Sequence, residues 1–239
     1  MRKLLLMSAA FCLASVVREE CAACYYAAHS LYDVRGYFEQ IVDSKDKERN
    51  TLVLFDGDNV ILRRNRHYSN VNLDEYVELY RDKNDPDSSA KINKVLNNKE
   101  LVDPEWPDYI KGLQDRGIKV MLLSAYKTDA AAACERYNEL QSSGIDFYAQ
   151  WKDVAAHYVT DHSDEVWGRP MFWAGMLLTG NCPKGVVLSE FLKAHPEYKF
   201  KRIIFIDDHD PNLKNVGNAV QNNLYYHCIL YNQVEKGDF

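Results

Sequence analysis

The sequence lacks a surplus of basic residues. Lys and Arg together number 29, against 35 Asp and Glu, and the formal net charge is −6. Proteins that bind nucleic acid or anionic membranes normally carry a basic surface. The composition therefore argues against both as the main partner, and the one dense basic cluster, at positions 63, 64 and 66, is too short to change this. No internal repeat or low-complexity tract is present, and 46% hydrophobic residues suffice for one core domain with a modest insertion.

Long apolar segments are also missing after the N-terminus, since a bilayer span needs about 20 apolar residues. At the N-terminus, Arg2 and Lys3 precede a mainly apolar stretch over 4–17, and small residues follow at Ala22-Ala23. This pattern predicts a signal peptide over 1–23, a mature chain of 24–239 without a membrane span, and export to the periplasm or the medium. The alternative is an ordinary buried first helix, which would leave the protein in the cytoplasm.

Metal-binding patterns of the Cys and His type are incomplete. Cys21 and Cys24 form a C-x-x-C pair, but no second pair completes a zinc site. Cleavage after residue 23 would leave four of the six cysteines, an even number that is compatible with disulfides, so the redox compartment stays open. His157 and His162 are five residues apart, off a shared helical face, and no third ligand is obvious. We therefore expect these two histidines to be surface residues or to face the cap.

Several unbroken apolar runs predict strands that are buried on both faces, as in parallel sheets. Helices are predicted between them because apolar residues recur there at helical spacing. The predicted strands are 51–55, 118–123, 203–206 and a short one at 226–230, and the predicted helices are 31–42, 107–116 and 184–194. Strands and helices in this order predict an α/β fold with a Rossmann-like, doubly wound parallel sheet.

A polar segment interrupts this pattern after the first predicted strand. Residues from about 62 to 104 are rich in Asn, Asp, Lys and Arg, and they contain a predicted amphipathic helix over 73–80 but no buried strand. An insertion of this length inside a compact domain usually has a function. We therefore expect it to form a small cap over the site. A second irregular stretch, 146–182, has no predicted element.

Three of the predicted strands end in polar side chains. Asp56 and Asp58 follow the first, Ser124 closes the second, and Asp207 and Asp208 close the third. Ligands of open α/β sheets bind outside the carboxyl ends of the strands, so these side chains are expected to converge. Carboxylates that lie this close repel one another unless a cation holds them. Oxygen donors of this kind favour Mg²⁺.

Such a set suits phosphoryl transfer. With Mg²⁺ bound, Asp56 would stay ionised and attack phosphorus, giving an aspartyl-phosphate. Asp58 could protonate the leaving oxygen and later deprotonate the attacking water. Ser124 could donate its hydroxyl to a phosphoryl oxygen, and Lys184 could stabilise charge in the transition state. Taken singly, these residues could also be turn formers, helix caps or a solvated lysine.

These residues also resemble the four motifs of the haloacid dehalogenase superfamily. Phe55-Asp56-Gly57-Asp58-Asn59-Val60 is similar to the first motif, and Leu122-Leu123-Ser124 to the second. Lys184 corresponds to the third, and the segment 206–212, which ends in Asn212 as a further polar group, to the fourth. They occur in the superfamily's order and span 51–212.

The resemblance implies a Rossmann-like core, Mg²⁺ and, usually, hydrolysis of phosphomonoesters. It also implies that the metal ligands are Asp56, Asp58 through its backbone carbonyl, Asp207 and Asp208, with Asn212 as an accessory. The segments 101–104, 117–121, 184–188 and 205–208 resemble a poorly characterised bacterial branch whose members often carry export signals.

Two positions depart from that branch. Tyr126 stands two residues after Ser124, where the branch has an arginine, and this puts in doubt a substrate contact there. Pro183, whose φ angle is fixed, directly precedes Lys184.

We therefore expect a Mg²⁺-dependent phosphomonoester hydrolase that acts on a phosphorylated small molecule or a phosphoprotein. Asp58 favours a phosphatase over a dehalogenase, because a chloride leaving group needs no proton. One alternative is an exported acid phosphatase of broad specificity. Another is a catalytically idle protein that keeps the fold and uses its cap to bind a partner.

Overall fold

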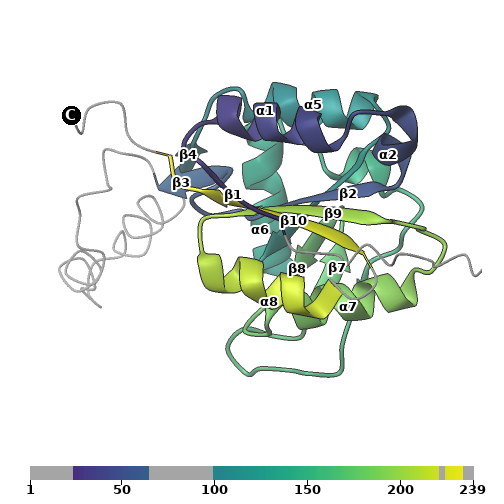
Figure 1. Cartoon of the computed structure of the whole chain (residues 1–239). Coiled ribbons are helices and arrows are strands. Elements are labelled where there is room, and N and C mark those ends of the chain that lie inside the picture. The colour runs from purple at the N-terminus through teal and green to yellow at the C-terminus, as the bar shows by residue number, and fades with distance from the viewer. Residues whose placement is uncertain (1–23, 65–98, 221–223, 234–239) are drawn as a thin grey trace, which may run out of the picture.

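The computed structural model describes residues 24–64, 99–220 and 224–233, and its centre is an eight-stranded sheet (Figure 1). Its strand order is β1-β10-β9-β2-β5-β8-β7-β6. The first six strands in this order, from β1 across to β8, pair in parallel. At the other edge, β7 pairs with β8 and β6 pairs with β7, both antiparallel. The strands are β1 (Cys24–Ala28), β2 (Thr51–Phe55), β5 (Lys119–Ser124), β6 (His157–Tyr158), β7 (Met171–Trp173), β8 (Met176–Leu178), β9 (Arg202–Asp207) and β10 (Tyr225–Tyr231).

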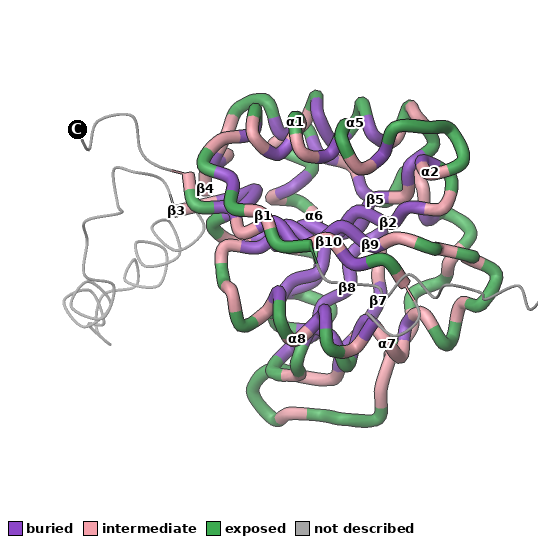
Figure 2. The backbone as a smooth tube through the Cα atoms, viewed as in Figure 1, coloured by how far each residue is buried: buried purple, intermediate pink, exposed green. Residues whose placement is uncertain are grey.

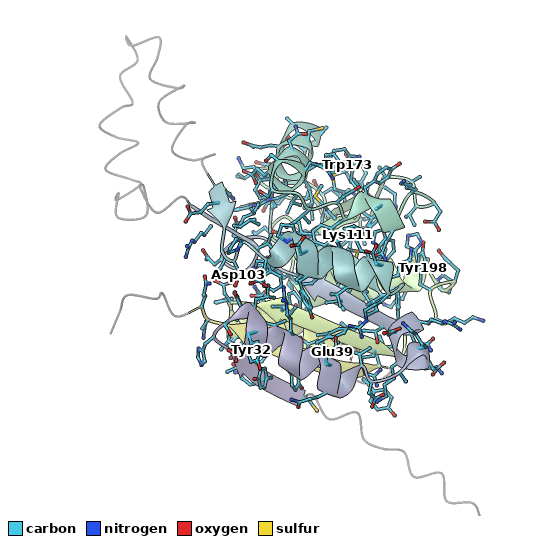
Figure 3. The ribbon with its side chains drawn as sticks, turned by 90° about the horizontal axis from the view of Figure 1, so that it is seen from above. Tyr32, Glu39, Asp103, Lys111, Trp173 and Tyr198 are labelled. Carbon is cyan, nitrogen blue, oxygen red and sulfur yellow. The ribbon has the colours of Figure 1, made fainter. Side chains whose placement is uncertain are left out.

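Helices cover both faces of the sheet, which confirms the predicted Rossmann-like α/β class. They are α1 (Leu31–Ile41), α2 (Lys45–Arg49), α5 (Trp106–Asp115), α6 (Ala130–Ser142), α7 (Lys184–Ala194) and α8 (Asp210–Val220). In Figure 1, α1 and α5 lie on one face and α7 and α8 on the other. Figure 3 looks down on the first face, where α1, with Tyr32 and Glu39, lies beside α5, with Lys111.

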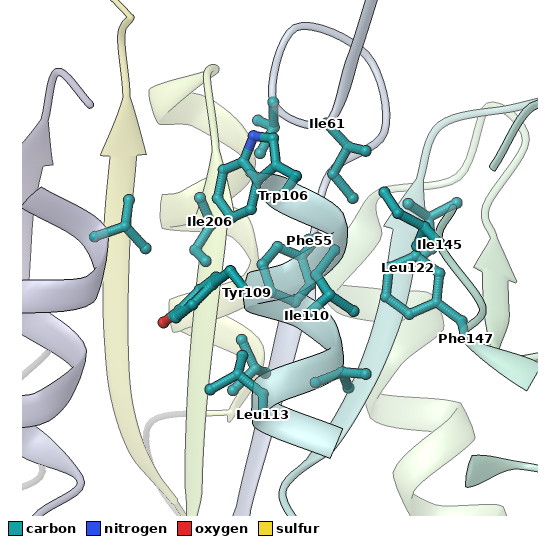
Figure 4. Close-up of a cluster of buried hydrophobic side chains, with 14 of the residues drawn as sticks. Phe55, Ile61, Trp106, Tyr109, Ile110, Leu113, Leu122, Ile145, Phe147 and Ile206 are labelled. Atoms are coloured by element: carbon teal, nitrogen blue, oxygen red, sulfur yellow. The ribbon is translucent and has the colours of Figure 1, made fainter. Parts of the chain in front are cut away.

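Two apolar cores form because successive side chains of a strand point to opposite faces. All five residues of β2 are buried (Figure 2). Val53 and Phe55 pack under α1 and α5, where the Phe55 and Trp106 rings lie 5.6 Å apart, centroid to centroid (Figure 4). Leu52 and Leu54 pack against α7 and α8 on the other face. The central strands are therefore apolar at every position because both of their faces pack against helices.

The predicted core elements are confirmed to within two residues at each boundary. Helices α2, α6 and α8 and the strands β3 (Leu62–Arg64) and β4 (Lys99–Leu101) were not predicted, and the missed strands of the main sheet lie near its edges. Strand β1 pairs with β10 at one edge, and much of it is exposed, so the sequence shows no apolar run there. Strands β8, β7 and β6 lie within the stretch 146–182, where we predicted no element. Each is only two or three residues long, too short for a periodic signal.

The ends of the polar insertion are held together by a small separate sheet. Strands β3 (Leu62–Arg64) and β4 (Lys99–Leu101) are antiparallel, and Leu62 pairs with Leu101. This pairing brings Lys99 to the edge of the sheet that carries the predicted site. The helix predicted over 73–80 lies outside the described residues, as does the predicted signal peptide over 1–23.

Two further findings concern the described residues as a whole. No helix among them has the length and apolar composition needed to cross a bilayer. No disulfide joins the four cysteines that the structure describes, which are Cys24, Cys134, Cys182 and Cys228.

Candidate active site

The sheet brings three predicted site residues to one edge. Asp56 directly follows β2, Ser124 ends β5, and Asp207 ends β9, and these three strands are parallel neighbours in the sheet. The Asp56 backbone N–H donates to the carbonyl of Ile206 at 2.9 Å, which continues the β2–β9 ladder up to the site. The chain crosses from one side of β2 to the other between β8 and β9, and ligands of open α/β sheets bind at such a switch point.

Three carboxylates cluster at this edge. Asp56, Asp207 and Asp208 each present a ligand oxygen, and these atoms all lie within 4.8 Å of one another. Asp207 is fully buried, Asp56 is 8% exposed, and Asp208 is half-buried. Acidic groups so close together and so poorly hydrated are unfavourable unless cations balance them.

One of those cations is Lys184. Its Nζ lies 2.8 Å from Asp56 Oδ1 and 2.7 Å from Asp207 Oδ2, although Lys184 is only 3% exposed. Burial by itself would lower the pKa of Lys184, but Asp56 and Asp207 raise it above the ordinary value. The lysine is therefore charged, and it balances only part of the negative charge of the cluster.

The pKa values of the carboxylates reflect that remaining imbalance. Burial raises the pKa of Asp56, the neighbouring Asp207 raises it further, and Lys184 opposes both. The pKa of Asp208 is also raised, first by burial and then by Asp207, while a hydrogen bond from Asn59 opposes the shift. A divalent cation at this cluster would lower both values, since it adds two positive charges.

Polar neighbours fix the orientation of Asp207. Its Oδ1 accepts from the backbone N–H of His209 at 2.7 Å. The side-chain amide of Asn212 donates to the same carboxylate, at 3.2 Å to Oδ1 and 3.1 Å to Oδ2. Asn212 therefore contributes to the site by holding the Asp207 carboxylate in place. His209 contributes its backbone N–H to the site.

The Asp58 carboxylate is not part of the cluster. Its Oδ1 accepts from Lys99 Nζ at 2.5 Å and its Oδ2 from Arg136 Nη2 at 2.8 Å. Burial would raise the pKa of Asp58, but Arg136 and Lys99 lower it below the usual range. Of the four acids predicted to surround one cation, the structure therefore brings together the side chains of Asp56, Asp207 and Asp208, and it pairs that of Asp58 with two cations.

Arg136, on α6, is a site residue that the sequence analysis missed. It is fully buried, its Nη1 lies 3.3 Å from Glu139 Oε2, and its guanidinium carbon lies 4.1 Å from the centre of the Tyr126 ring. Neither Nε nor Nη1 has a hydrogen-bond partner. No local pattern distinguishes this residue from a surface arginine of an ordinary helix. Lys99 was missed for the same reason.

Arg136 and Ser124 both border the loop after β2. A Cβ added at Gly57 would lie 3.1 Å from Ser124 Oγ and 3.4 Å from Arg136 Nη1. Glycine thus leaves room for both polar groups beside Asp56 and Asp58. The arginine expected at position 126 is absent, but the Arg136 guanidinium stacks on the ring of the Tyr126 that replaces it.

Pro183 does not disturb the neighbouring lysine. It has φ −57° and caps α7, whose first residue is Lys184. The fixed φ of proline is suited to the start of a helix. The residue after it therefore enters the site with its ammonium between the two aspartates.

The donor set fits Mg²⁺, the ion that the resemblance implies. Three carboxylates offer hard oxygen ligands, and the half-exposed Asp208 leaves the cluster open to water on one side. Lys184 leaves two carboxylate charges for a divalent ion to balance. Asp56, Asp207 and Asp208 are the side chains that would hold it.

Comparisons with known proteins place the chain in a family. A search of curated proteins and a search of solved structures found no significant match. A family model described as "Protein of unknown function (DUF2608)" matches residues 28–238. The matched range contains all the candidate site residues described above, from Asp56 to Asn212. The chain therefore belongs to the DUF2608 family.

Proposed function

We propose that this protein is a Mg²⁺-dependent phosphomonoester hydrolase with Asp56 as its nucleophile, a member of the haloacid dehalogenase superfamily. The observation that carries the proposal is the cluster of Asp56, Asp207 and Asp208 around the buried Lys184 ammonium at a switch point of the sheet. An aspartate that is paired with a buried ammonium and lies beside two further carboxylates is suited to attack on a phosphate whose charge is also neutralised.

Bound Mg²⁺ would neutralise charge on the phosphoryl oxygens and lower the pKa of Asp56. Asp56 Oδ1 already accepts from the Gly57 backbone N–H and from Lys184, so we assign the attack to Oδ2. A bond forms from Oδ2 to phosphorus while the bond from phosphorus to the leaving oxygen breaks. Lys184 stays beside the reacting carboxylate and stabilises the charge that develops. Water then attacks the phosphorus of the aspartyl-phosphate, the bond from phosphorus to Oδ2 breaks, and inorganic phosphate leaves with the Asp56 carboxylate regenerated.

Asp58 is assigned the proton transfers. Its pairs with Lys99 and Arg136 lower its pKa and so keep it ionised. A bound phosphate dianion would compete for these two cations and weaken their hold on Asp58. The pKa of Asp58 would then rise toward the range in which it can protonate the leaving oxygen. It would afterwards accept the proton of the attacking water.

Arg136 and Ser124 are assigned to the binding of the phosphoryl group. The Nε and Nη1 atoms of Arg136 are buried and make no hydrogen bond, although Nη1 lies 3.3 Å from Glu139 Oε2, and buried donors of this kind gain most from an anionic ligand. Ser124 Oγ lies on the same side of Gly57 as Arg136. The substrate class remains a phosphorylated small molecule or a phosphoprotein. Export, predicted from a signal peptide over 1–23, would place that substrate outside the cytoplasm.

The experiment measures release of p-nitrophenol from p-nitrophenyl phosphate, with Mg²⁺ and with EDTA, for the wild type and Asp56→Asn. We expect activity only in the wild type with Mg²⁺. The matched control is Asp115→Asn on α5, an exposed carboxylate that pairs with Lys111 and should leave the rate unchanged. Acid quenching with a ³²P-labelled substrate should trap phosphate on the wild-type chain and not on Asp56→Asn.

Two results would overturn the proposal. Full activity in Asp56→Asn would remove this residue as the nucleophile. A folded wild type with no activity across a panel of sugar phosphates, nucleotides and phosphopeptides would favour the alternative of an idle binding protein. Comparable rates on many members of that panel would instead favour the exported acid phosphatase of broad specificity.

A further inference from the structure

Two histidines face each other at a second place in the molecule. His157, in β6 at the edge of the sheet, has its Nε2 only 3.4 Å from the Nε2 of His195, the residue that caps the C-terminus of α7. They are 38 residues apart in the sequence. Lys184 begins α7 and His195 follows its last residue, so this pair lies on the order of 16 Å from the candidate active site along the helix axis.

The other ring nitrogen of each histidine determines what these Nε2 atoms can do. His157 Nδ1 lies 2.9 Å from the carbonyl oxygen of Ala155, and His195 Nδ1 lies 2.9 Å from Glu197 Oε1. Carbonyl and ionised carboxylate oxygens only accept hydrogen bonds, so both Nδ1 atoms carry the proton. In two neutral rings, the two Nε2 lone pairs would therefore point at each other. That arrangement is repulsive unless a positive charge lies between them.

The spacing matches a shared metal ion. With metal–nitrogen bonds of about 2.0–2.1 Å, two ligands of a tetrahedral ion are about 3.3–3.4 Å apart. The Nε2 atoms are 3.4 Å apart. In histidine metal sites, the second ring nitrogen usually donates to a carboxylate or a backbone carbonyl. The Ala155 and Glu197 contacts supply one of each.

The surroundings hold both rings in place and favour a cation. The His157 ring is stacked on Phe191, at 6.3 Å between centroids, and the His195 ring lies 4.6 Å from the same ring. The Tyr198 ring lies 6.0 Å from the His195 ring, centroid to centroid, and Tyr198 is labelled in Figure 3. The C-terminus of α7 contributes negative potential. Glu197 adds a charge, since its own backbone N–H and the His195 side chain lower its pKa.

We propose that His157 and His195 form a binding site for a divalent transition-metal ion of the Zn²⁺ class. Imidazole nitrogen suits Zn²⁺, Cu²⁺ and Ni²⁺ rather than Mg²⁺, so the site is chemically different from the carboxylate cluster. Among the described residues, no third His, Cys, Asp or Glu side chain completes the set within 4.8 Å, so water would supply the remaining ligands of a bound ion. The ion would tie the short edge strand β6 to the end of α7.

The test uses ¹⁵N-histidine-labelled protein in saturating Mg²⁺, so that the carboxylate cluster is occupied. Zn²⁺ is added, and the ring nitrogens of the seven histidines are followed by long-range ¹H–¹⁵N correlation. We expect the Nε2 signals of His157 and His195 to shift together while the exposed His162 does not respond. The thermal midpoint should rise with Zn²⁺, because an ion that binds only the folded state stabilises it.

Three variants separate ligation from packing. His157→Phe keeps an aromatic ring against Phe191 but removes the nitrogens, and His195→Gln removes the second ligand. Each should weaken Zn²⁺ binding in calorimetry by about tenfold or more, and Glu197→Gln, which changes only the partner of Nδ1, by about tenfold. His162→Gln is the matched control and should bind as the wild type does.

Several outcomes would overturn the proposal. The site is absent if Zn²⁺ leaves both Nε2 signals unshifted, or if His157→Phe and His195→Gln bind the ion as well as the wild type. If the ring signals of His157 and His195 shift together with pH but do not respond to Zn²⁺, the two Nε2 atoms share a proton and do not bind a metal. The test does not depend on phosphatase activity, so it can succeed or fail independently of the proposed reaction.

Discussion

Replacing Asp56 by Asn should stabilise the metal-free protein at neutral pH, although Asp56 is the proposed nucleophile. Burial, and then the charge of Asp207, raise the pKa of Asp56 from 3.8 to about 7, in spite of Lys184. The ionised carboxylate is therefore a cost to the folded state. Asparagine keeps the size of the side chain and removes the charge. The burial beside Asp207 that suits Asp56 to bind a cation should therefore lower the stability of the metal-free protein.

The sign of the pH dependence follows from the raised value. Between pH 3.8 and about 7, the unfolded chain has lost this proton while the folded protein still binds it. The unfolded state then binds fewer protons, so the stability contributed by Asp56 falls as pH rises through this window. One pKa unit corresponds to about 1.4 kcal/mol, which gives a cost of about 4 kcal/mol at pH 7. About 2 kcal/mol of it should develop between pH 5 and pH 7.

The assay is urea unfolding in EDTA at pH 5 and pH 7, for the wild type, Asp56→Asn and Asp115→Asn. The free energy of unfolding of Asp56→Asn relative to the wild type should increase by about 2 kcal/mol between the two pH values. The control should show no such change, since the Asp115 side chain is 63% exposed on α5. Adding Mg²⁺ should stabilise the wild type more than Asp56→Asn. A difference that stays constant with pH, or that shrinks as pH rises, would refute the reasoning.

Three further predictions concern the packing around the site. Lys184→Met should destabilise the protein by about 3–5 kcal/mol, whereas Asp56→Asn should stabilise it, because the Met variant leaves Asp56 and Asp207 without their buried cation. The measurement is urea unfolding in EDTA at pH 7. No loss of stability would mean that the lysine is not charged. Gly185→Ala should cost about 1–3 kcal/mol in the same assay, because its Cβ would lie 2.4 Å from the backbone oxygen of Asn215. Its control, Gly112→Ala on α5, meets nothing within 4 Å and should be neutral or stabilising by up to about 1 kcal/mol. Arg136→Lys should raise KM for p-nitrophenyl phosphate about tenfold or more through the loss of guanidinium donors, and an unchanged KM would exclude Arg136 from phosphate binding.

The core of the fold was predictable because its signals are local. The runs at 51–55, 118–123 and 203–206 are apolar at every position, and such runs are found in strands covered on both faces. The structure places them as β2, β5 and β9, side by side in the sheet. Strand β1 gave no comparable signal because it lies at an edge, where half-exposed Tyr26 and exposed Tyr25 are tolerated. Strand β8 was missed because three residues are too few to show a period.

The candidate site was predictable wherever a strand end delivers the residue. Asp56, Ser124 and Asp207 converge because parallel neighbours end at the same edge, and that geometry follows from the element order alone. The partners of Asp58 could not be found in this way. Lys99 is 41 residues away and Arg136 is 78 residues away, on elements whose local sequences resemble solvated ones.

By itself, the sequence determined which segments are buried and which acids stand at the strand ends, because burial and strand endings are properties of short stretches of chain. Only the tertiary structure decided which charges meet. It separated the Asp58 carboxylate from the other three acids, put Lys184 between Asp56 and Asp207, and turned His157 toward His195. The physical reason is that pairing of charges and lone pairs depends on distances of a few ångströms between elements, which only the packing of the whole domain sets.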